Sequence, residues 1–216
     1  MSDHLDSVAT ALGWELGDAL DGDRAVDARG GRLLGQRVAL VVCGGIAAYR
    51  TPDLCRALRR EGAELVVYCT PSALEFVTPL SIEWTALSAP IVQLGGRAEH
   101  VEVGAIDLWL VAPATYSSIN KLAAGIADNA ALTALAGALG GLVADGTPML
   151  IAPAMHGSMV NRILRDSLAR LTALGVDIIA PRGRDGKALL PEVEDLVSHV
   201  VAATSSDDSA AQSDPR

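Results

Sequence analysis

The sequence predicts an α/β protein in which a parallel sheet carries helices on both faces. From residue 37 onwards, short apolar runs alternate with longer amphipathic stretches, a pattern typical of strand–helix repeats. The apolar runs show no alternation of polar and apolar residues, which is typical of strands that are buried on both faces. With 216 residues, 50% of them hydrophobic, the chain is long enough to bury one sizeable core.

The apolar runs and the stretches between them predict the elements in order. Strands are expected at 37–43, 64–69, 107–112, 147–152 and 176–180, with a weaker one at 90–93. Helices are expected at 45–61, 72–88, 116–142, 158–174 and 191–202. Pro79 should break the second of these helices, and the third should break near Asp128.

The pattern indicates one domain with two appendages. Residues 1–36 combine a short stretch at helical spacing with a passage rich in Gly and Asp, so we expect an N-terminal extension rather than a second domain. Residues 37–203 form the domain itself. Residues 204–216 lack an apolar face and are expected to be a disordered tail.

Charge and composition exclude several classes of function. Lys and Arg total 17 against 26 Asp and Glu, a net charge of -9, which disfavours nucleic acid as a partner. The chain starts without a basic segment and has no run long enough for a bilayer, so we expect a soluble, cytoplasmic protein without a membrane partner. The three cysteines show no metal-binding spacing; buried, reduced thiols are expected, and no metal site.

The turn after the first strand contains Gly44, Gly45, Ile46 and Ala47. Backbone amides at such a strand-to-helix turn favour an anion, so this turn is a candidate phosphate site. The full dinucleotide-binding fingerprint is not present. A tight turn without a ligand would need the same glycines, and both interpretations stay open.

Two further strand exits carry hydroxyl groups. Thr70 and Ser72 follow the second strand and either cap a helix or bind a ligand, and the nearby Phe76 fills the core or borders a planar ligand. The third strand ends in the run Pro113, Ala114, Thr115, Tyr116, Ser117. This run allows a close backbone approach to a flat polar heterocycle, or simply starts a capped helix.

The exit of the fourth strand reads Pro153-Ala154-Met155-His156. Ligands of open parallel sheets bind outside the carboxyl ends of strands, so this segment is expected to border a site. His156 and His100 are the two histidines on loops of this kind, and a loop histidine suits proton transfer. A basic turn with Arg182, Arg184 and Lys187 either holds a substrate phosphate or is solvated.

Taken together, these loops resemble the flavin-containing cysteine decarboxylase family. The matching stretches recur in the family's order between about residues 37 and 180: Gly44 to Tyr49, Thr70 to Pro79, Ala112 to Thr115, Asn120 to Asp128, and Ala152 to Met155. The resemblance implies a three-layer, Rossmann-like, doubly wound parallel sheet. It also implies an FMN-dependent lyase that assembles as a homotrimer or a multiple such as a homododecamer, with FMN shared between subunits.

The resemblance also implies roles for individual residues. Oxidation of a cysteine thiol by FMN would lead to decarboxylation of a phosphopantothenoylcysteine-like or peptidyl cysteine substrate, giving an enethiol. His100 corresponds to the acid–base residue, and His156 adds a second catalytic candidate. FMN would contact Gly44, Gly45, Ile46, Ala47, Thr70, Ser72, Phe76, Pro113, Ala114, Thr115, Tyr116, Ser117, Ala154 and Met155. The substrate would contact His156, Met159, Arg182, Arg184 and Lys187.

The chain departs from the family pattern at three places. His156 stands where the family has an Asn that grips the substrate carboxylate, and a histidine binds a carboxylate when it is protonated. The coenzyme A branch of the family has a Cys in a late substrate clamp, whereas no Cys follows Cys69 in this chain. Tyr116-Ser117 stands where the family has an Asn at the third strand exit. These departures leave two alternatives: an FMN-dependent oxidoreductase acting on a non-cysteine substrate, or a non-catalytic regulatory subunit of the same fold.

Overall fold

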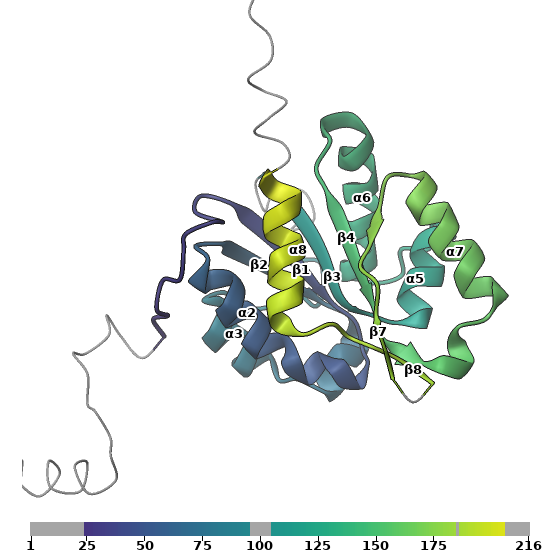
Figure 1. Ribbon diagram of the computed structural model, residues 1–216, viewed down its shortest axis with the longest axis horizontal. Coiled ribbons are helices and arrows are strands. Elements are labelled where there is room, and N and C mark those ends of the chain that lie inside the picture. The colour runs from purple at the N-terminus through teal and green to yellow at the C-terminus, as the bar shows by residue number, and fades with distance from the viewer. Residues whose placement is uncertain (1–23, 96–104, 185, 206–216) are drawn as a thin grey trace, which may run out of the picture.

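A five-stranded parallel sheet forms the centre of the protein (Figure 1). The structure is a computed structural model that describes residues 24–95, 105–184 and 186–205. The strand order is β2-β1-β3-β4-β6. The strands are β1 (Arg37–Val42), β2 (Glu64–Cys69), β3 (Leu108–Ala114), β4 (Met149–Pro153) and β6 (Asp177–Ile178). All pairings in this sheet are parallel, in agreement with the predicted fold class.

Helices connect the strands in the predicted order. The α-helices are α2 (Thr51–Arg60), α3 (Pro79–Ala86), α5 (Tyr116–Ala123), α6 (Ala130–Asp145), α7 (Arg162–Ala173) and α8 (Val193–Ser205). Short 3-10 helices η1 (Ile46–Arg50), η2 (Pro71–Glu75) and η3 (Gly157–Met159) precede three of them. Both predicted helix breaks are confirmed, because α3 begins at Pro79 and the chain between α5 and α6 passes through Asp128.

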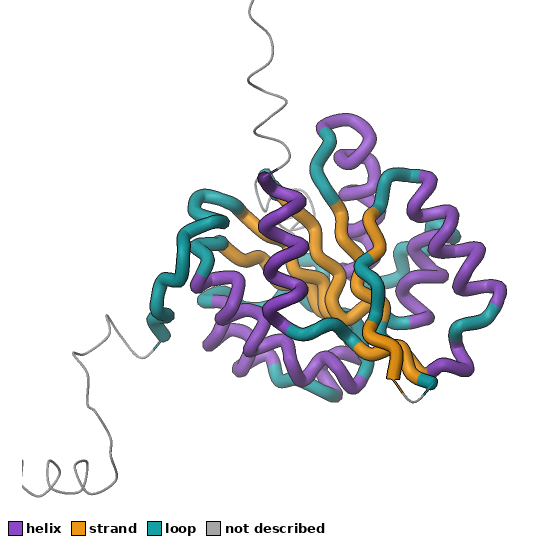
Figure 2. Tube along the Cα trace, in the orientation of Figure 1, coloured by secondary structure: helices purple, strands orange, loops and turns teal. Residues whose placement is uncertain are grey.

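The sheet has helices on both faces, as Figure 2 shows. In β1, Val38 and Leu40 belong to a core cluster with residues of α2, α3 and α8, whereas Ala39 and Val41 pack with α5, α6 and α7. Successive side chains of a strand point to opposite faces, so an uninterrupted apolar run serves two cores at once. The predicted three-layer, doubly wound arrangement is therefore confirmed.

Several boundaries differ from the prediction. The weak strand at 90–93 is reduced to an isolated bridge between Ile91 and Tyr68. Helix α8 extends to Ser205, so two residues of the expected tail are helical, and residues 206–216 lie outside the described residues. A second sheet was not predicted at all: β5 (Met155–His156), β8 (Lys187–Leu189) and β7 (Arg182–Arg184) pair in antiparallel fashion.

The three cysteines are free and buried, which confirms their interpretation as reduced thiols. Burial raises the pKa of both Cys55 and Cys69 to about 12, and it also raises the pKa of Cys43. The thiols are therefore protonated at neutral pH and poorly nucleophilic.

Among the described residues, no helix combines the length and the apolar content needed to cross a bilayer.

Part of the N-terminal extension contributes to the core. Leu33 is completely buried in the cluster that contains α2 and α8, and its amide donates to the carbonyl oxygen of Glu61 at 2.7 Å. We expect Leu33→Ala to lower the free energy of unfolding by about 2–5 kcal/mol, as large-to-small core substitutions do. The control Leu34→Ala, at a residue 78% exposed, should change it by less than about 0.5 kcal/mol. Urea unfolding of both variants checks this, and equal effects would contradict the packing role of Leu33.

Three ion-paired carboxylates make the fold sensitive to acid. Hydrogen bonds from Arg32, Lys121 and Arg50 lower the pKa values of Glu61, Asp128 and Glu192, respectively. A carboxylate whose pKa is lower in the folded state stabilises the fold above its unfolded pKa, and this stabilisation is lost as the pH falls through the folded pKa.

We therefore expect the urea midpoint to fall as the pH drops from about 5 to 3, the range around ordinary carboxyl pKa values and below. Glu61→Gln should be less stable than the wild type at pH 7 and should approach it at pH 3, because protonation removes the same ion pair. A constant difference between the two proteins across this range would refute the contribution of Glu61.

Candidate functional site

The candidate site lies where the order of the sheet reverses. The chain moves from β1 outward to β2 and then returns to place β3 on the other side of β1. Ligands of doubly wound sheets bind at this switch point, outside the carboxyl ends of the strands. In this chain the loops that leave β1 and β3 are the turn at Gly44-Gly45 and the start of α5 at Thr115.

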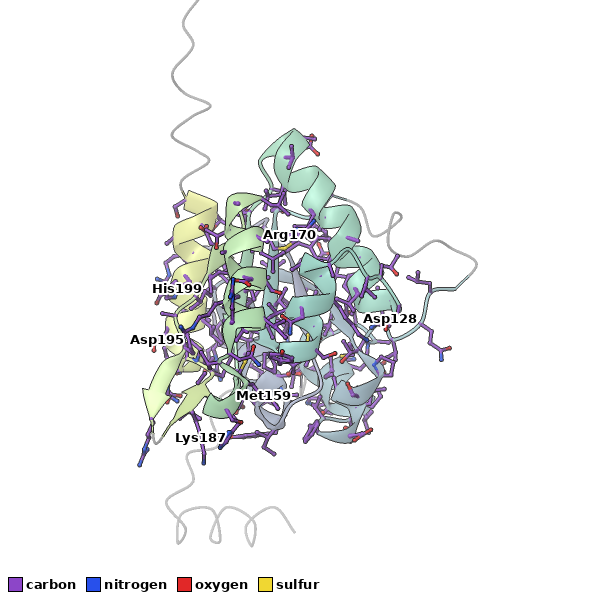
Figure 3. The ribbon with its side chains drawn as sticks, turned by 90° about the vertical axis from the view of Figure 1, so that its right-hand side faces the viewer. Asp128, Met159, Arg170, Lys187, Asp195 and His199 are labelled. Atoms are coloured by element: carbon purple, nitrogen blue, oxygen red, sulfur yellow. The ribbon has the colours of Figure 1, made fainter. Side chains whose placement is uncertain are left out.

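A cleft of about 900 Å³ opens at this point and is formed by the exits of β1, β2, β3 and β4. Figure 3 shows two of its residues, Met159 and Lys187, at the lower end of the molecule, and Asp128 on the flank opposite α8. The cleft is lined by Gly44, Gly45, Ile46, Ala47, Thr70, Pro71, Ser72, Pro113, Thr115, Tyr116, Ser117, Ser118, Lys121, Asp128, Asn129, Leu132, Ala154, Met155, His156, Met159, Lys187, Ala188, Leu189 and Leu190.

The glycine turn packs directly against the exit of β2. The amide of Gly44 donates to Oγ1 of Thr70 at 3.1 Å. A Cβ atom on Gly44 would lie 2.2 Å from Oγ and 2.7 Å from the carbonyl carbon of Ser72. Only glycine therefore allows the exits of β1 and β2 to approach this closely. The packing of the turn requires a glycine at position 44 whether or not a ligand binds there.

The exit of β3 presents a set of hydroxyl groups. Thr115 caps α5: its Oγ1 accepts from the amide of Ser118 at 3.4 Å and lies 3.1 Å from Oγ of Ser118. The hydroxyl of Tyr116 accepts from Nδ2 of Asn161, the capping residue of α7, at 3.3 Å. The cap predicted at the third strand exit is thus confirmed at Thr115, which also lines the cleft. The capping alternative for the second strand exit is wrong, because Thr70 precedes η2 without a capping hydrogen bond from its side chain.

An ion pair that the sequence analysis did not assign to the site forms part of the wall. Nζ of Lys121 donates to Oδ2 of Asp128 at 2.5 Å, and Nδ2 of Asn129 donates to the other carboxylate oxygen at 3.0 Å. The bond from Lys121 is the largest cause of the lowered pKa of Asp128. The stretch 120–128 was among the matching motifs. The predicted helix break near Asp128 indicated that the chain forms a loop there, between α5 and α6.

The second sheet forms the lip of the cleft. Met155 and His156 pair with Ala188 and Lys187, so the basic turn folds back over the exit of β4. A Cβ atom on Gly157 would lie 1.7 Å from the carbonyl oxygen of Gly186. The absence of a side chain at Gly157 therefore permits the contact between the chain after β5 and the hairpin of β7 and β8.

Most of the predicted site residues line the cleft, and four described ones do not. Ala114 is completely buried in the core, because alternation along β3 turns its side chain away from the cleft. Phe76 does not line the cleft, and 39% of its surface is exposed. Arg184 lies on β7 and does not line the cleft either. Arg182 forms an ion pair with Glu192 and donates to the carbonyl oxygen of Leu190, so it is held at the base of α8. His100 lies outside the described residues.

Known proteins resemble this chain in sequence and fold. The coenzyme A biosynthesis bifunctional protein CoaBC of Thermococcus kodakarensis is 34% identical over 176 residues, which cover 79% of this chain and 42% of that protein. The chain spans about two fifths of the length of the curated relatives it matches. Solved structures share the fold as well. The FMN-dependent cysteine decarboxylase SpaF has a TM-score of 0.68 and 28% identity, with 80% of this chain and 99% of SpaF covered. A PPC decarboxylase variant complexed with pantothenoylaminoethenethiol has a TM-score of 0.63 and 27% identity, with 76% and 96% covered.

A family model described as Flavoprotein matches residues 28–205, which include the complete sheet and every described residue of the cleft lining. The match begins within the N-terminal segment that contributes Leu33 to the core. The chain belongs to the Flavoprotein family.

Proposed function

We propose that the chain binds FMN in the cleft and uses it to decarboxylate a cysteine-derived carboxylate, either a phosphopantothenoylcysteine-like molecule or a peptidyl cysteine. The observation that carries this proposal is the cleft at the switch point of the sheet, where four strand exits meet in a chain of the Flavoprotein family. The likeness to SpaF and to PPC decarboxylase supports the choice of substrate class.

The residues of the cleft fit a flavin mononucleotide. A volume of about 900 Å³ lies within the range of pockets that enclose a small ligand. Its apolar walls include Ile46, Leu132 and Met155, which suit a flat ring. The glycine turn and the hydroxyl of Ser72 would hold the phosphate, since backbone amides at the start of a helix favour an anion. Thr115 and Ser117 offer hydroxyls to the ribityl chain or the polar ring edge.

The chemistry that FMN supplies when bound is acceptance of a hydride equivalent from the carbon that carries the thiol, after which the carboxylate leaves as CO2 and an enethiol remains. Around this reaction the chain's own residues bind and orient the substrate. Met155 and Met159 border the reacting end, and His156 and Lys187 provide polar groups at the lip. We assign the acid–base role to His100 on the resemblance of its segment to the family motif.

Apolar side chains at the mouth of the cleft support the proposal that the chain assembles as a homotrimer or a multiple of trimers. Ile46 is 73% exposed and Met159 is 44% exposed, although both line the cleft. Tyr49 and Phe76, on neighbouring segments, are also exposed. Large exposed apolar groups that gather beside a ligand site indicate an interface. Light scattering coupled to size-exclusion chromatography should give a mass three or twelve times that of the chain; a monomer would refute this assembly.

An anaerobic single-turnover experiment tests the reaction. The purified protein, loaded with FMN, is mixed with phosphopantothenoylcysteine or with a peptide that ends in cysteine. Loss of the oxidised flavin absorbance together with release of CO2 is the expected result, because two electrons from the substrate remain on the cofactor. Bound flavin that neither thiol substrate reduces would favour an oxidoreductase acting on a non-cysteine substrate.

A further inference from the structure

A carboxylate just before α8 joins two segments that are far apart in the sequence. Oε2 of Glu192 accepts a hydrogen bond from Nη2 of Arg50, the last residue of η1. Oε1 of the same carboxylate forms an ion pair with Nη1 of Arg182, the first residue of β7. Glu192 therefore connects the helix that follows the glycine turn to the hairpin of β7 and β8.

The backbone beside Glu192 binds the same two arginines. Nη1 of Arg50 donates to the carbonyl oxygen of Pro191 at 3.1 Å, and Nε of Arg182 donates to the carbonyl oxygen of Leu190 at 3.3 Å. Each planar guanidinium thus has two acceptors, which fixes its orientation. The Glu192 side chain is 45% exposed, and a single exposed ion pair stabilises a fold little. A network that uses both carboxylate oxygens has more effect on how the segments are placed than on overall stability.

The two connected segments border the same cleft. Ile46 and Ala47 of η1 line it, and so do residues 187–190 of the hairpin and its exit. Ala47 also packs against the core cluster that contains Leu190, and both residues border one small void together with Arg50. Apolar contact and ion pairs therefore act together between η1 and the exit of the hairpin. Glu192 itself does not line the cleft.

We propose that Glu192 is a positioning residue that couples the flavin side of the cleft to the substrate side. FMN bound at the glycine turn fixes η1, and the link from Arg50 through Glu192 to Arg182 then holds the hairpin over the cleft. The inference rests on the proposed function, which assigns the glycine turn to FMN and the hairpin to the substrate. Because coupling between two binding sites is reciprocal, a substrate held by the hairpin strengthens FMN binding by the same factor.

Hydrogen exchange followed by mass spectrometry tests the coupling on the full chain, with and without saturating FMN. Amides of the hairpin exchange when it opens, so their exchange rate reports how firmly it is held. In the wild type we expect FMN to slow exchange in residues 182–190 by about fivefold or more, the lower end of usual coupling factors. In Glu192→Gln, which still binds FMN at saturation, this slowing should disappear. A purely stabilising role of Glu192 would instead speed exchange by the same factor with and without FMN.

A second variant cuts the link on the flavin side only. Arg50→Gln leaves every hairpin residue unchanged, yet FMN should no longer slow hairpin exchange in this protein. Glu194→Gln and Arg56→Gln are the matched controls, because they make the same changes at exposed positions of α8 and α2. Both controls should show the slowing of the wild type.

Steady-state kinetics provide an independent measurement. Glu192→Gln should raise the KM for the thiol substrate by about fivefold. The rate of flavin reduction at saturating substrate should stay unchanged, because Glu192 lies outside the cleft and acts only through the hairpin. An unchanged KM, or a fall in the saturated rate alone, would contradict a positioning role.

Two exchange results overturn the inference: FMN that binds the wild type without slowing hairpin exchange, or slowing that survives in both Glu192→Gln and Arg50→Gln. The outcome is separable from the proposed reaction. Slowing that depends on Glu192, in a protein whose flavin no thiol reduces, would refute the decarboxylation and leave the coupling intact. Flavin reduction by a thiol without any slowing would do the opposite, and a protein that binds no FMN would refute both.

Discussion

Replacing Gly44 with alanine should reduce the affinity for FMN by about 10- to 100-fold. The new methyl group would lie 2.2 Å from Oγ and 2.7 Å from the carbonyl carbon of Ser72, so the exits of β1 and β2 would have to separate. Overpacking of this kind costs about 1–3 kcal/mol, and each 1.4 kcal/mol is tenfold in affinity. The same movement would displace the two groups that we assign to the flavin phosphate.

The measurement is fluorescence titration of the flavin-free protein with FMN. Gly140→Ala is the matched control, because Gly140 lies in α6 and nothing lies within 4 Å of the position that an added Cβ would take. This control should bind FMN as the wild type does and gain up to about 1 kcal/mol in stability. A Gly44→Ala protein that folds and binds FMN with unchanged affinity would contradict the assignment of the glycine turn.

Replacing Gly157 with alanine should weaken substrate binding by about 10- to 100-fold while the flavin content stays the same. A Cβ atom there would lie 1.7 Å from the carbonyl oxygen of Gly186, and backbone cannot give way as a flexible side chain does. The hairpin of β7 and β8 would have to move, and Lys187 would move with it. The cost again falls within the range of overpacking, about 1–3 kcal/mol.

Flavin absorbance per chain and the KM for the thiol substrate measure the two effects separately. Gly183→Ala, on β7, is the matched control, since no atom lies within 4 Å of the position of its added Cβ. Equal losses of flavin and substrate in Gly157→Ala would show that the lip is not a separate part of the site.

The central sheet and the four strand exits were predictable because their signals are local. An unbroken apolar run identifies a strand buried on both faces, and the residues that follow it fall at the carboxyl edge of a parallel sheet. This reasoning placed Gly44, Thr70, Thr115 and Met155 together, although they lie far apart in the sequence, and the cleft contains all four.

The lip of the cleft was not predictable in the same way. Strands β5, β7 and β8 have two or three residues each, too few to show a period, and their pairing depends on the contact between Gly157 and Gly186. Arg182 was expected to bind substrate because its charge was visible in the sequence. Its partner Glu192 became apparent only with the start of α8 in place. The direction of the Ala114 side chain was not predicted either. Strand β3 continues two residues beyond its expected end, so Ala114 belongs to the strand and not to the loop that follows it.

The most direct test of the flavin assignment is the absorption spectrum of the protein as purified, followed by mass spectrometry of the cofactor released on denaturation. We expect the two absorption bands of oxidised flavin and the mass of FMN at about one molecule per chain, with a lower flavin content in Gly44→Ala. A colourless protein that stays free of flavin after incubation with FMN would contradict the assignment of the cleft.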